Sequence, residues 1–181
     1  MTHAFQTGLS AAEERDFAQT NWWLHDAHWY AAVAVRWGVE EANIINLQAI
    51  ERAARGAVLQ LRRRGLLAVP VTTPDLERTF RLLWQLFFPD GMYQAGTFCF
   101  SGGTGQWVGT ECRAFQQVKR AGLQGQYRCG CAAFRDGVRK GLGAAFEHEI
   151  IESLMQGNER CVVRFRMNGG PGTSGGPGEE G

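Results

Sequence analysis

The spacing of apolar residues in the first half of the chain is typical of α-helices. It predicts a first helix over residues 11–37, ending near Gly38, and a second helix over about residues 40–64. Gly65 is suited to ending the second helix, because glycine readily adopts the backbone conformation found just past a helix C-terminus. The apolar stripe of the second helix consists of Leu47, Ile50, Ala54, Ala57, Val58 and Leu61.

A third helix is predicted to begin in the stretch TTPDLE. Thr73 suits the N-cap position and Pro74 the first helical position, and the carboxylate of Asp75 is favoured at the positive end of the helix dipole. The segment 89–91, which contains proline and glycine, is expected to end this helix. Its apolar positions are Leu76, Phe80, Leu83 and Phe87.

The second half of the chain has the pattern of two β-hairpins. Residues 92–100 and 106–115 form the first hairpin across the Gly-rich turn SGGTG, and residues 148–155 and 160–165 form the second. Residues 132–143 have the spacing of a helix between them. This order predicts an α+β fold, in which N-terminal helices pack on an antiparallel sheet of about four strands with an inserted helix.

A chain of 181 residues is long enough for one domain with a sizeable core. We expect residues 1–167 to form a single α+β ligand-binding domain. Residues 168–181 are rich in glycine and proline and carry no apolar side chain that would anchor them, so we expect a disordered tail.

The charge balance and the cysteine count narrow the choice of partner and compartment. Nineteen Lys and Arg residues oppose eighteen Asp and Glu residues, which argues against a nucleic-acid partner because such proteins need a basic face. No apolar run reaches the roughly 18 residues that a membrane span requires, and no secretory signal is evident. Five cysteines is an odd number, which favours reduced thiols in the cytoplasm.

The first helix combines an aromatic stripe with an acidic residue. At about 100° per residue, Asp26 falls in the middle of the stripe and His25 falls at its edge. A buried acid is costly unless it is paired, and desolvation raises its pKa, which suits a general acid or base. Asp26 and His25 are therefore the candidate catalytic residues. The candidate ligand-binding residues of the stripe are Trp22, Trp29, Tyr30 and Val33.

A structural interpretation of the same residues stays open. Asp26 would then bond a neighbouring backbone group or a tryptophan indole N–H and serve packing alone. His25 would be a partly exposed helix residue, and the aromatic stripe would belong to the core.

The second hairpin brings a thiol, an imidazole and a carboxylate to one face if its register is as expected. We pair Cys161 with Leu154, which places His148 and Glu152 on the apolar face of the last strand. A one-residue change in the loop would turn both side chains outward. Cys99, in the first hairpin, is expected to be a core residue.

Three interpretations of the cysteines follow from this placement. Cys129 and Cys131 stand where a helix starts and would complete a zinc-like or iron-like site with His148, Glu152 and Cys161, because zinc binds thiolate, imidazole and carboxylate groups. Alternatively, a thiol with a lowered pKa acts as a nucleophile without metal. In the third interpretation the cysteines are buried structural residues.

Three segments of the chain resemble known families. The stretch NWWLHDAHWYAAVAVRWGVEEAN is similar to the N-terminal helix of a group of uncharacterised cytosolic bacterial and archaeal proteins, at Asp26, Trp29, Val33, Gly38 and Glu40. The stretch ECRAFQQVKRAGLQGQYRCGC resembles a second segment of that group, at Cys112, Arg113, Gly122, Leu123, Tyr127 and Cys129. The ending ESLMQGNERCVVRF resembles that of 4-vinyl reductase domains and of the L-2-amino-thiazoline-4-carboxylic acid hydrolase family, at Gly157, Cys161 and Phe165.

The resemblance implies the small-ligand-binding α+β fold of 4-vinyl reductase and transport-particle relatives. Some members of that fold bind zinc through cysteine and glutamate ligands and enclose an apolar ligand beside the metal. The resemblance also implies a structural alternative, because transport-particle relatives dimerise through helices, and this chain would then form a homodimer.

Residues and resemblance together predict a cytoplasmic protein that binds a small, partly apolar or aromatic organic molecule. The pocket is expected between the first helix and the sheet, beside the Cys/His/carboxylate site. If the protein is an enzyme, a metal-assisted hydrolase is the class expected, since metal-bound water needs an open coordination position and a nearby acid or base. The alternative is a non-catalytic ligand sensor whose zinc is structural.

Overall fold

The computed structural model of the chain describes residues 7–89, 92, 96–101, 103–143 and 145–168. Within these residues, five α-helices and a four-stranded antiparallel sheet form an α+β fold, as the sequence predicts. Of the tail expected over residues 168–181, only Asn168 lies among the described residues.

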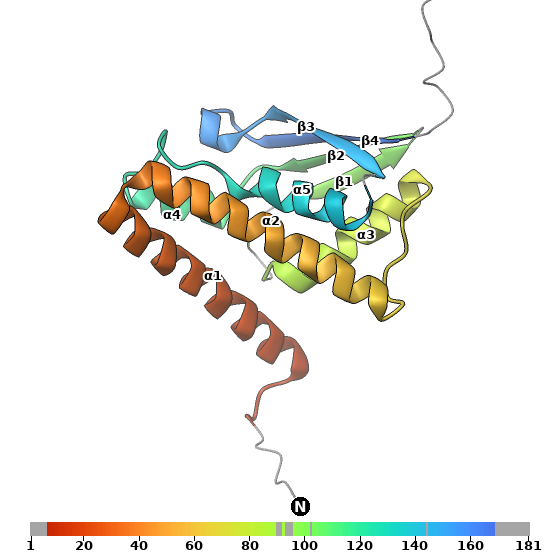
Figure 1. Cartoon of the computed structure of the whole chain (residues 1–181), viewed down its shortest axis with the longest axis horizontal. Helices are drawn as coiled ribbons and strands as arrows, with labels where there is room; N and C mark the ends of the chain where they lie inside the picture. Colours follow the sequence, from red (N-terminus) through yellow and green to blue (C-terminus); the bar gives the residue numbers. More distant parts are fainter. Residues whose placement is uncertain (1–6, 90–91, 93–95, 102, 144, 169–181) are drawn as a thin grey trace, which may run out of the picture.

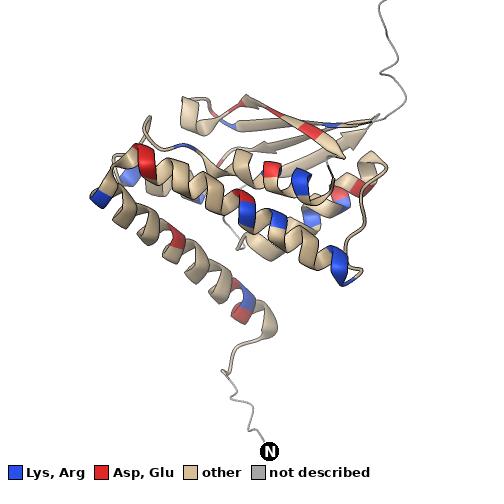
Figure 2. Ribbon diagram, in the orientation of Figure 1, with Lys and Arg blue, Asp and Glu red and all other residues tan. Residues whose placement is uncertain are grey.

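The first two helices form a hairpin that turns at a glycine (Figure 1). Helix α1 spans Ala11–Trp37 and α2 spans Val39–Arg63, both close to prediction. Gly38 between them has φ 93°, a conformation that side chains other than glycine rarely adopt. Acidic residues begin α2 and basic residues end it, the arrangement that the helix dipole favours (Figure 2).

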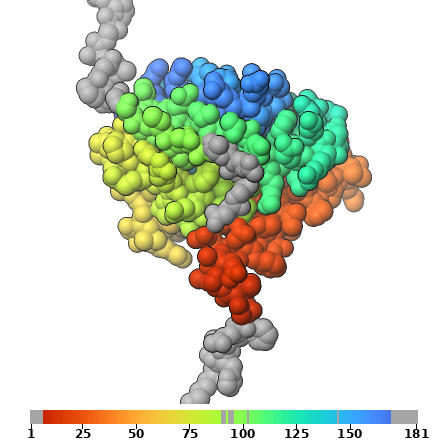
Figure 3. Space-filling view, turned by 180° about the vertical axis from the view of Figure 1, so that it is seen from behind, coloured from red at the N-terminus to blue at the C-terminus, as the bar shows by residue number. Residues whose placement is uncertain are grey.

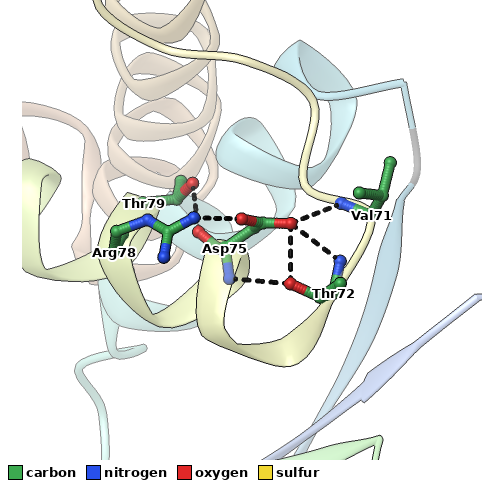
Figure 4. A network of polar contacts seen from close by, with 5 residues as sticks. All are labelled: Val71, Thr72, Asp75, Arg78 and Thr79. Carbon is green, nitrogen blue, oxygen red and sulfur yellow. Dashed lines mark hydrogen bonds and ion pairs between the residues drawn. The ribbon is translucent and has the colours of Figure 1, made fainter.

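Helix α3 spans Thr73–Phe87, and its N-cap is Thr72 rather than the predicted Thr73. The hydroxyl of Thr72 accepts a hydrogen bond from the Asp75 backbone N–H at 3.3 Å (Figure 4). The Asp75 carboxylate in turn accepts from the Thr72 N–H at 3.0 Å and pairs with Arg78. This reciprocal capping box requires the carboxylate three positions after the cap, a spacing to Asp75 that Thr72 satisfies and Thr73 does not.

The two hairpins form one sheet because β2 pairs with β4, which gives the strand order β1-β2-β4-β3. The strands are β1 Thr97–Ser101, β2 Thr104–Gly109, β3 Phe146–Glu152 and β4 Cys161–Met167. Helices α3 and α5 contact the sheet, α2 packs against α5, and α1 packs against α2 (Figure 1).

Two of the predicted strands end earlier in the structure than expected, and one helix was not expected. The strand expected over residues 106–115 ends at Gly109, and α4 (Arg113–Arg120) follows, capped by the Cys112 side chain. Helix α5 (Gly130–Gly141) corresponds to the helix that was expected over residues 132–143. The third strand ends at Glu152, and a 3₁₀ turn (Leu154–Gln156) follows it. Cys99 is exposed on β1 instead of buried in the core.

The register of the second hairpin confirms one predicted side-chain direction and overturns the other. Phe165 pairs with His148 instead of Ile150, and this shift by two residues keeps His148 on the inner face. A β-bulge between Ile150 and Glu152 adds one residue to β3, so that Glu152 pairs with Val162 and turns to the other face.

Helices α2 and α5 approach each other closely because α5 presents glycines to α2. A Cβ atom on Gly137 would lie 2.3 Å from the Glu51 carbonyl oxygen and 2.8 Å from the Ala54 Cβ. A Cβ atom on Gly141, one turn later, would lie 2.7 Å from a methyl carbon of Val58. The two helices therefore pack backbone against backbone, and this contact sets the position of the segment that precedes α5.

We predict that Gly137→Ala destabilises the fold by about 1–3 kcal/mol, because the added methyl group overlaps backbone atoms that cannot move independently. Urea denaturation measures the change. The matched control is Gly56→Ala in the middle of α2, where no atom lies within 4 Å of the added Cβ. That substitution should stabilise by up to about 1 kcal/mol through helix propensity. Equal effects of the two substitutions would contradict the close contact.

Candidate functional site

A cavity of about 790 Å³ lies between α1 and α4, within the range typical of small-molecule sites. Figure 3 shows these two segments meeting on one face of the molecule, α1 in red to orange and residues 111–127 in green to teal. Helix α2 adds one residue to the wall, Asn46. The residues of the wall that carry the argument below are Trp23, Asp26, Tyr30, Asn46, Cys112 and Tyr127.

The side of α1 that lines the cavity is not centred on the predicted aromatic stripe. Tyr30 lines the cavity as expected, and Trp23, which was not among the candidates, lines it as well. Trp22 and Trp29 are 60% and 37% exposed and are not part of the wall. Val33 is buried in a small cluster with Tyr30 and Ala42. Apolar residues lie on several sides of α1, so its partners α2 and α4 decide which side faces inward.

The aromatic rings of the wall are held in place by hydrogen bonds. The indole N–H of Trp23 donates to the Phe87 carbonyl oxygen at 2.9 Å, and the Tyr30 hydroxyl donates to Asn43 Oδ1 at 2.9 Å. The Tyr127 ring meets the Tyr30 ring edge-on, with 5.2 Å between centroids. The cavity is therefore bounded by rings whose positions are already fixed.

Asn43 connects three segments of the chain around the cavity. Besides accepting from Tyr30 of α1, its Oδ1 accepts from the Arg128 backbone N–H at 2.9 Å, and its Nδ2 donates to the Gln126 carbonyl oxygen at 2.8 Å. Asn43 is fully buried, so these bonds form out of contact with water. They hold α1, α2 and the segment before α5 in one arrangement.

Asn46, one turn further along α2, has the opposite character. It is 2% exposed and lines the cavity, and its Oδ1 has no hydrogen-bond partner among the described residues. A buried acceptor without a partner costs about 1–3 kcal/mol. Asn43 and Asn46 both fall on the buried stripe of α2, and two asparagines on an apolar helix face are a sequence signal for a polar site at this position.

Asp26 is a half-buried carboxylate in the cavity wall. It accepts no hydrogen bond from any described residue, and the indole N–H of Trp23, in the same wall, donates to the Phe87 carbonyl oxygen. Burial raises the pKa of Asp26 above its ordinary value of 3.8, and the charge of His25 opposes this rise. Asp26 therefore carries an unbalanced desolvation cost when it is ionised.

His25 lies outside the cavity. It is exposed and its ring stacks on that of Trp22, with 6.1 Å between centroids. The histidine that lines the cavity is His28, which is also exposed to solvent. Its position, two residues after Asp26, gave no signal in the sequence pattern.

Burial keeps three of the cysteine thiols protonated. Burial raises the pKa of Cys112 from 9.0 to about 12, and the Cys112 sulfur accepts a hydrogen bond from the Phe115 N–H at 3.5 Å. A hydrogen bond with Cys131, and then burial, raise the pKa of Cys129. Burial also raises the pKa of Cys161, whose sulfur accepts from the Leu154 N–H at 3.4 Å. These thiols have the properties of structural cysteines rather than of activated nucleophiles.

The imidazole and the carboxylate expected beside these thiols have other partners. His148 Nε2 lies 3.2 Å from an oxygen of Asp136, and burial lowers the pKa of His148. Glu152 forms a bidentate pair with Arg160, at 3.0 and 2.9 Å, on the face to which the β-bulge turns it. The five residues proposed as ligands, Cys129, Cys131, His148, Glu152 and Cys161, are therefore not assembled into one set.

The described residues do not fit a zinc or iron site. No three His, Cys, Asp or Glu side chains among them are close enough together to hold a metal ion. His148 pairs with Asp136 and Glu152 pairs with Arg160, so the expected nitrogen and oxygen ligands have other partners. We derive no chemical step from a metal.

Comparison with protein-family models gives no match, and comparison with curated proteins gives none either. The likeness to 4-vinyl reductase domains and to the thiazoline hydrolase family stays a prediction from the motifs alone. In the part of the chain that is described, no helix combines the length and the apolar character that crossing a membrane requires.

We predict that Asp26→Asn raises the thermal unfolding midpoint at pH 7. Because the pKa of Asp26 is raised in the folded protein, the folded state binds the carboxyl proton more tightly than the unfolded state. Ionisation of Asp26 at higher pH therefore lowers the stability of the wild type, whereas the neutral amide of the variant loses no stability in this way. The advantage of the variant should disappear as the pH falls below about 4, where both states are protonated.

Differential scanning calorimetry between pH 3.5 and pH 8 measures this difference. The control is Glu41→Gln, which removes an exposed carboxylate of α2 that does not line the cavity. A variant Asp26→Asn that is less stable than the wild type at pH 7 would mean that the carboxylate has a stabilising partner.

Proposed function

We propose that the protein binds a small, partly apolar or aromatic organic molecule in the cavity between α1 and α4. The observation that carries the proposal is the cavity of about 790 Å³, whose surface is mostly apolar and whose wall includes the rings of Trp23, Tyr30 and Tyr127. Sites for small organic molecules have this character, with mostly apolar walls and a small number of placed polar side chains. The site lies between two helices and not, as expected from the sequence, between α1 and the sheet.

The fixed rings of the wall support binding over mere packing. Trp23 and Tyr30 are already held by hydrogen bonds to Phe87 and Asn43, so a ligand orders few side chains when it enters. Affinity increases when less conformational freedom is lost on binding. Opposite them, Val118 and Leu123 supply apolar surface for the body of the ligand.

The polar groups of the cavity carry a stability cost that a ligand would relieve. Asp26 is desolvated without a hydrogen bond from any described residue, and Asn46 Oδ1 lacks a partner. Proteins tolerate such costs mainly at sites where function requires the group. We assign the protein a binding function and no reaction.

We predict that wild-type protein binds prodan, a neutral naphthalene dye that fluoresces more strongly in apolar surroundings, in a saturable manner. Ala27→Trp should weaken this binding at least tenfold, because Ala27 lines the cavity and an indole at that position fills it. The control is Ala32→Trp, on a side of α1 that does not line the cavity. Fluorescence titration measures both. Equal loss with the two variants, or no saturable binding to wild type, would contradict the proposal.

A second candidate function is self-assembly through α1. The outer surface of this helix exposes large apolar side chains, among them Trp22 at 60% and Val35 at 90%. The large apolar side chains that α1 exposes are Phe17, Trp22, Leu24, Trp29, Val35 and Trp37. Trp22 and Trp29 lie two turns apart on one side of the helix, and exposed apolar surface of this kind marks protein interaction sites. The resemblance to transport-particle relatives implies a homodimer formed through helices, without naming α1.

The charges of α1 favour a second copy of the chain as the partner. Its first turn carries Glu13 and Glu14, and its last turn carries Arg36. Two copies of α1 packed antiparallel about a twofold axis would bring each acidic end to the basic end of the other helix. The outer apolar side chains would be buried between them.

We predict that the wild-type protein is a dimer whose dissociation depends on concentration, measured by sedimentation velocity. Trp22→Glu should shift it to monomer by placing a charge in the contact. Val71→Glu, which alters an 81% exposed side chain in the loop before α3, should leave the dimer intact. A monomeric wild-type protein at high concentration would overturn this candidate.

A further inference from the structure

The charged groups of the cavity are unevenly distributed. Asp26 is half-buried, whereas Glu111, Arg113 and Arg120 are exposed to solvent. Among the described residues no ion pair joins Asp26 to Arg113 or Arg120, and the charge that opposes the rise of its pKa is that of His25. The half-buried carboxylate of the cavity therefore has no direct cationic partner among the described residues, and the arginines of the wall are exposed to solvent.

The polar groups near this carboxylate have little to donate to it. The Tyr30 hydroxyl donates to Asn43, and the Trp23 indole N–H donates to Phe87. Tyr127 is close enough for the charge of Asp26 to act on its hydroxyl, yet no hydrogen bond joins the two. The carboxylate thus has acceptor capacity that the described residues do not use.

Asn46 adds a second acceptor to the same cavity. Its buried Oδ1 has no donor, and rotation of the amide exchanges the positions of its oxygen and its amino group. In either orientation this side chain lacks a full set of partners among the described residues. Both side chains line the same cavity, so a ligand with several N–H donors would find an acceptor in Asp26 and another in Asn46.

The aromatic walls suit a positively charged group. The rings of Trp23, Tyr30 and Tyr127 line the cavity together with Asp26. Aromatic faces attract cations through their quadrupole, most strongly where water is excluded, and aromatic cages recognise ammonium groups in this way. An anionic ligand would instead meet the Asp26 carboxylate in surroundings that screen it poorly.

We infer that the ligand of the cavity is an apolar or aromatic amine, bound as its cation with the ammonium group at Asp26 and Asn46 and the body between the rings of α1 and the apolar side chains of α4. The inference rests on the proposed function, because it names the ligand class of the same cavity. The ammonium donates hydrogen bonds to the carboxylate and to the amide oxygen.

Three compounds with one ring system and different charges test the inference. They are 1-naphthylmethylamine, which is a cation at pH 7.5, 1-naphthylmethanol, which is neutral, and 1-naphthoate, which is an anion. Each competes with prodan in a fluorescence titration of wild-type protein. The amine should bind at least tenfold more tightly than the alcohol, as a charge-assisted hydrogen bond permits, and the naphthoate should bind most weakly.

Substitution of Asp26 tests whether its carboxylate causes the preference for the amine over the alcohol. Asp26→Asn should reduce the preference for the amine over the alcohol to threefold or less, while the control Glu41→Gln should keep the tenfold preference. Asn46→Leu should reduce it by a smaller factor, because it removes an acceptor and no charge. Circular dichroism checks that each variant folds, and if Asp26→Asn does not fold, the series on wild-type protein decides alone.

The pH dependence provides an independent readout. Lowering the pH from 7.5 to 4.5 should weaken the binding of the amine more than that of the alcohol, because burial raises the pKa of Asp26 and its protonation removes the negative charge. His25 and His28 face both compounds alike. The other ionisable groups around the cavity, Glu111, Arg113, Arg120, Tyr30, Tyr127 and Cys112, are the same for both compounds.

The outcomes separate the two levels of the proposal. If neither prodan nor any of the three compounds binds, the proposed function itself fails. If they bind and the alcohol or the naphthoate equals the amine, the cavity is a binding site and the inference about amines is overturned. Tight amine binding that survives Asp26→Asn in a folded variant would also overturn it.

Discussion

The arrangement around the cavity depends on the buried hydrogen bonds of Asn43. A single side chain accepts from Tyr30 of α1 and from the Arg128 N–H, and donates to the Gln126 carbonyl oxygen. Each bond satisfies a group that would otherwise be buried without a partner, at a cost of about 1–3 kcal/mol. The long helix α1 has only two buried side chains of its own, so this network largely determines where it lies.

Close packing of α5 on α2 supports that network from the other side. The glycines of α5 let the two backbones meet, and the segment that carries Tyr127 enters α5 directly from the bonds to Asn43. The cavity is thus formed by elements held together by packing and buried hydrogen bonds, while Asp26 and Asn46 Oδ1 in its wall have no hydrogen-bond partner in the described part of the chain. A buried Asn43 that is hydrogen-bonded beside an Asn46 oxygen that is not, one turn away, is consistent with a site kept for a ligand.

The fold was largely predictable, and the candidate site only in part. The helix boundaries and the inward side of β4 follow from periodicity. The inward direction of His148 was predicted correctly because its register differs from the expected one by two residues, which keeps a side chain on the same face of the sheet. The direction of Glu152 did not follow, since the bulge beside it adds one residue. Helix α4 was missed because Cys112, a residue type uncommon as a cap, begins it.

The amino-acid sequence by itself determined the helices and the hairpins, because these depend on near neighbours in the chain. Only the tertiary structure decided which side of α1 faces the cavity and which groups meet there. Apolar residues surround α1 on several sides, so its packing on α2 and its hydrogen bonds to the end of α3 made that choice. In the same way, His148 pairs with Asp136 and Glu152 pairs with Arg160. The partner of a polar side chain is the group nearest in space, which the spacing of residues along the sequence does not determine.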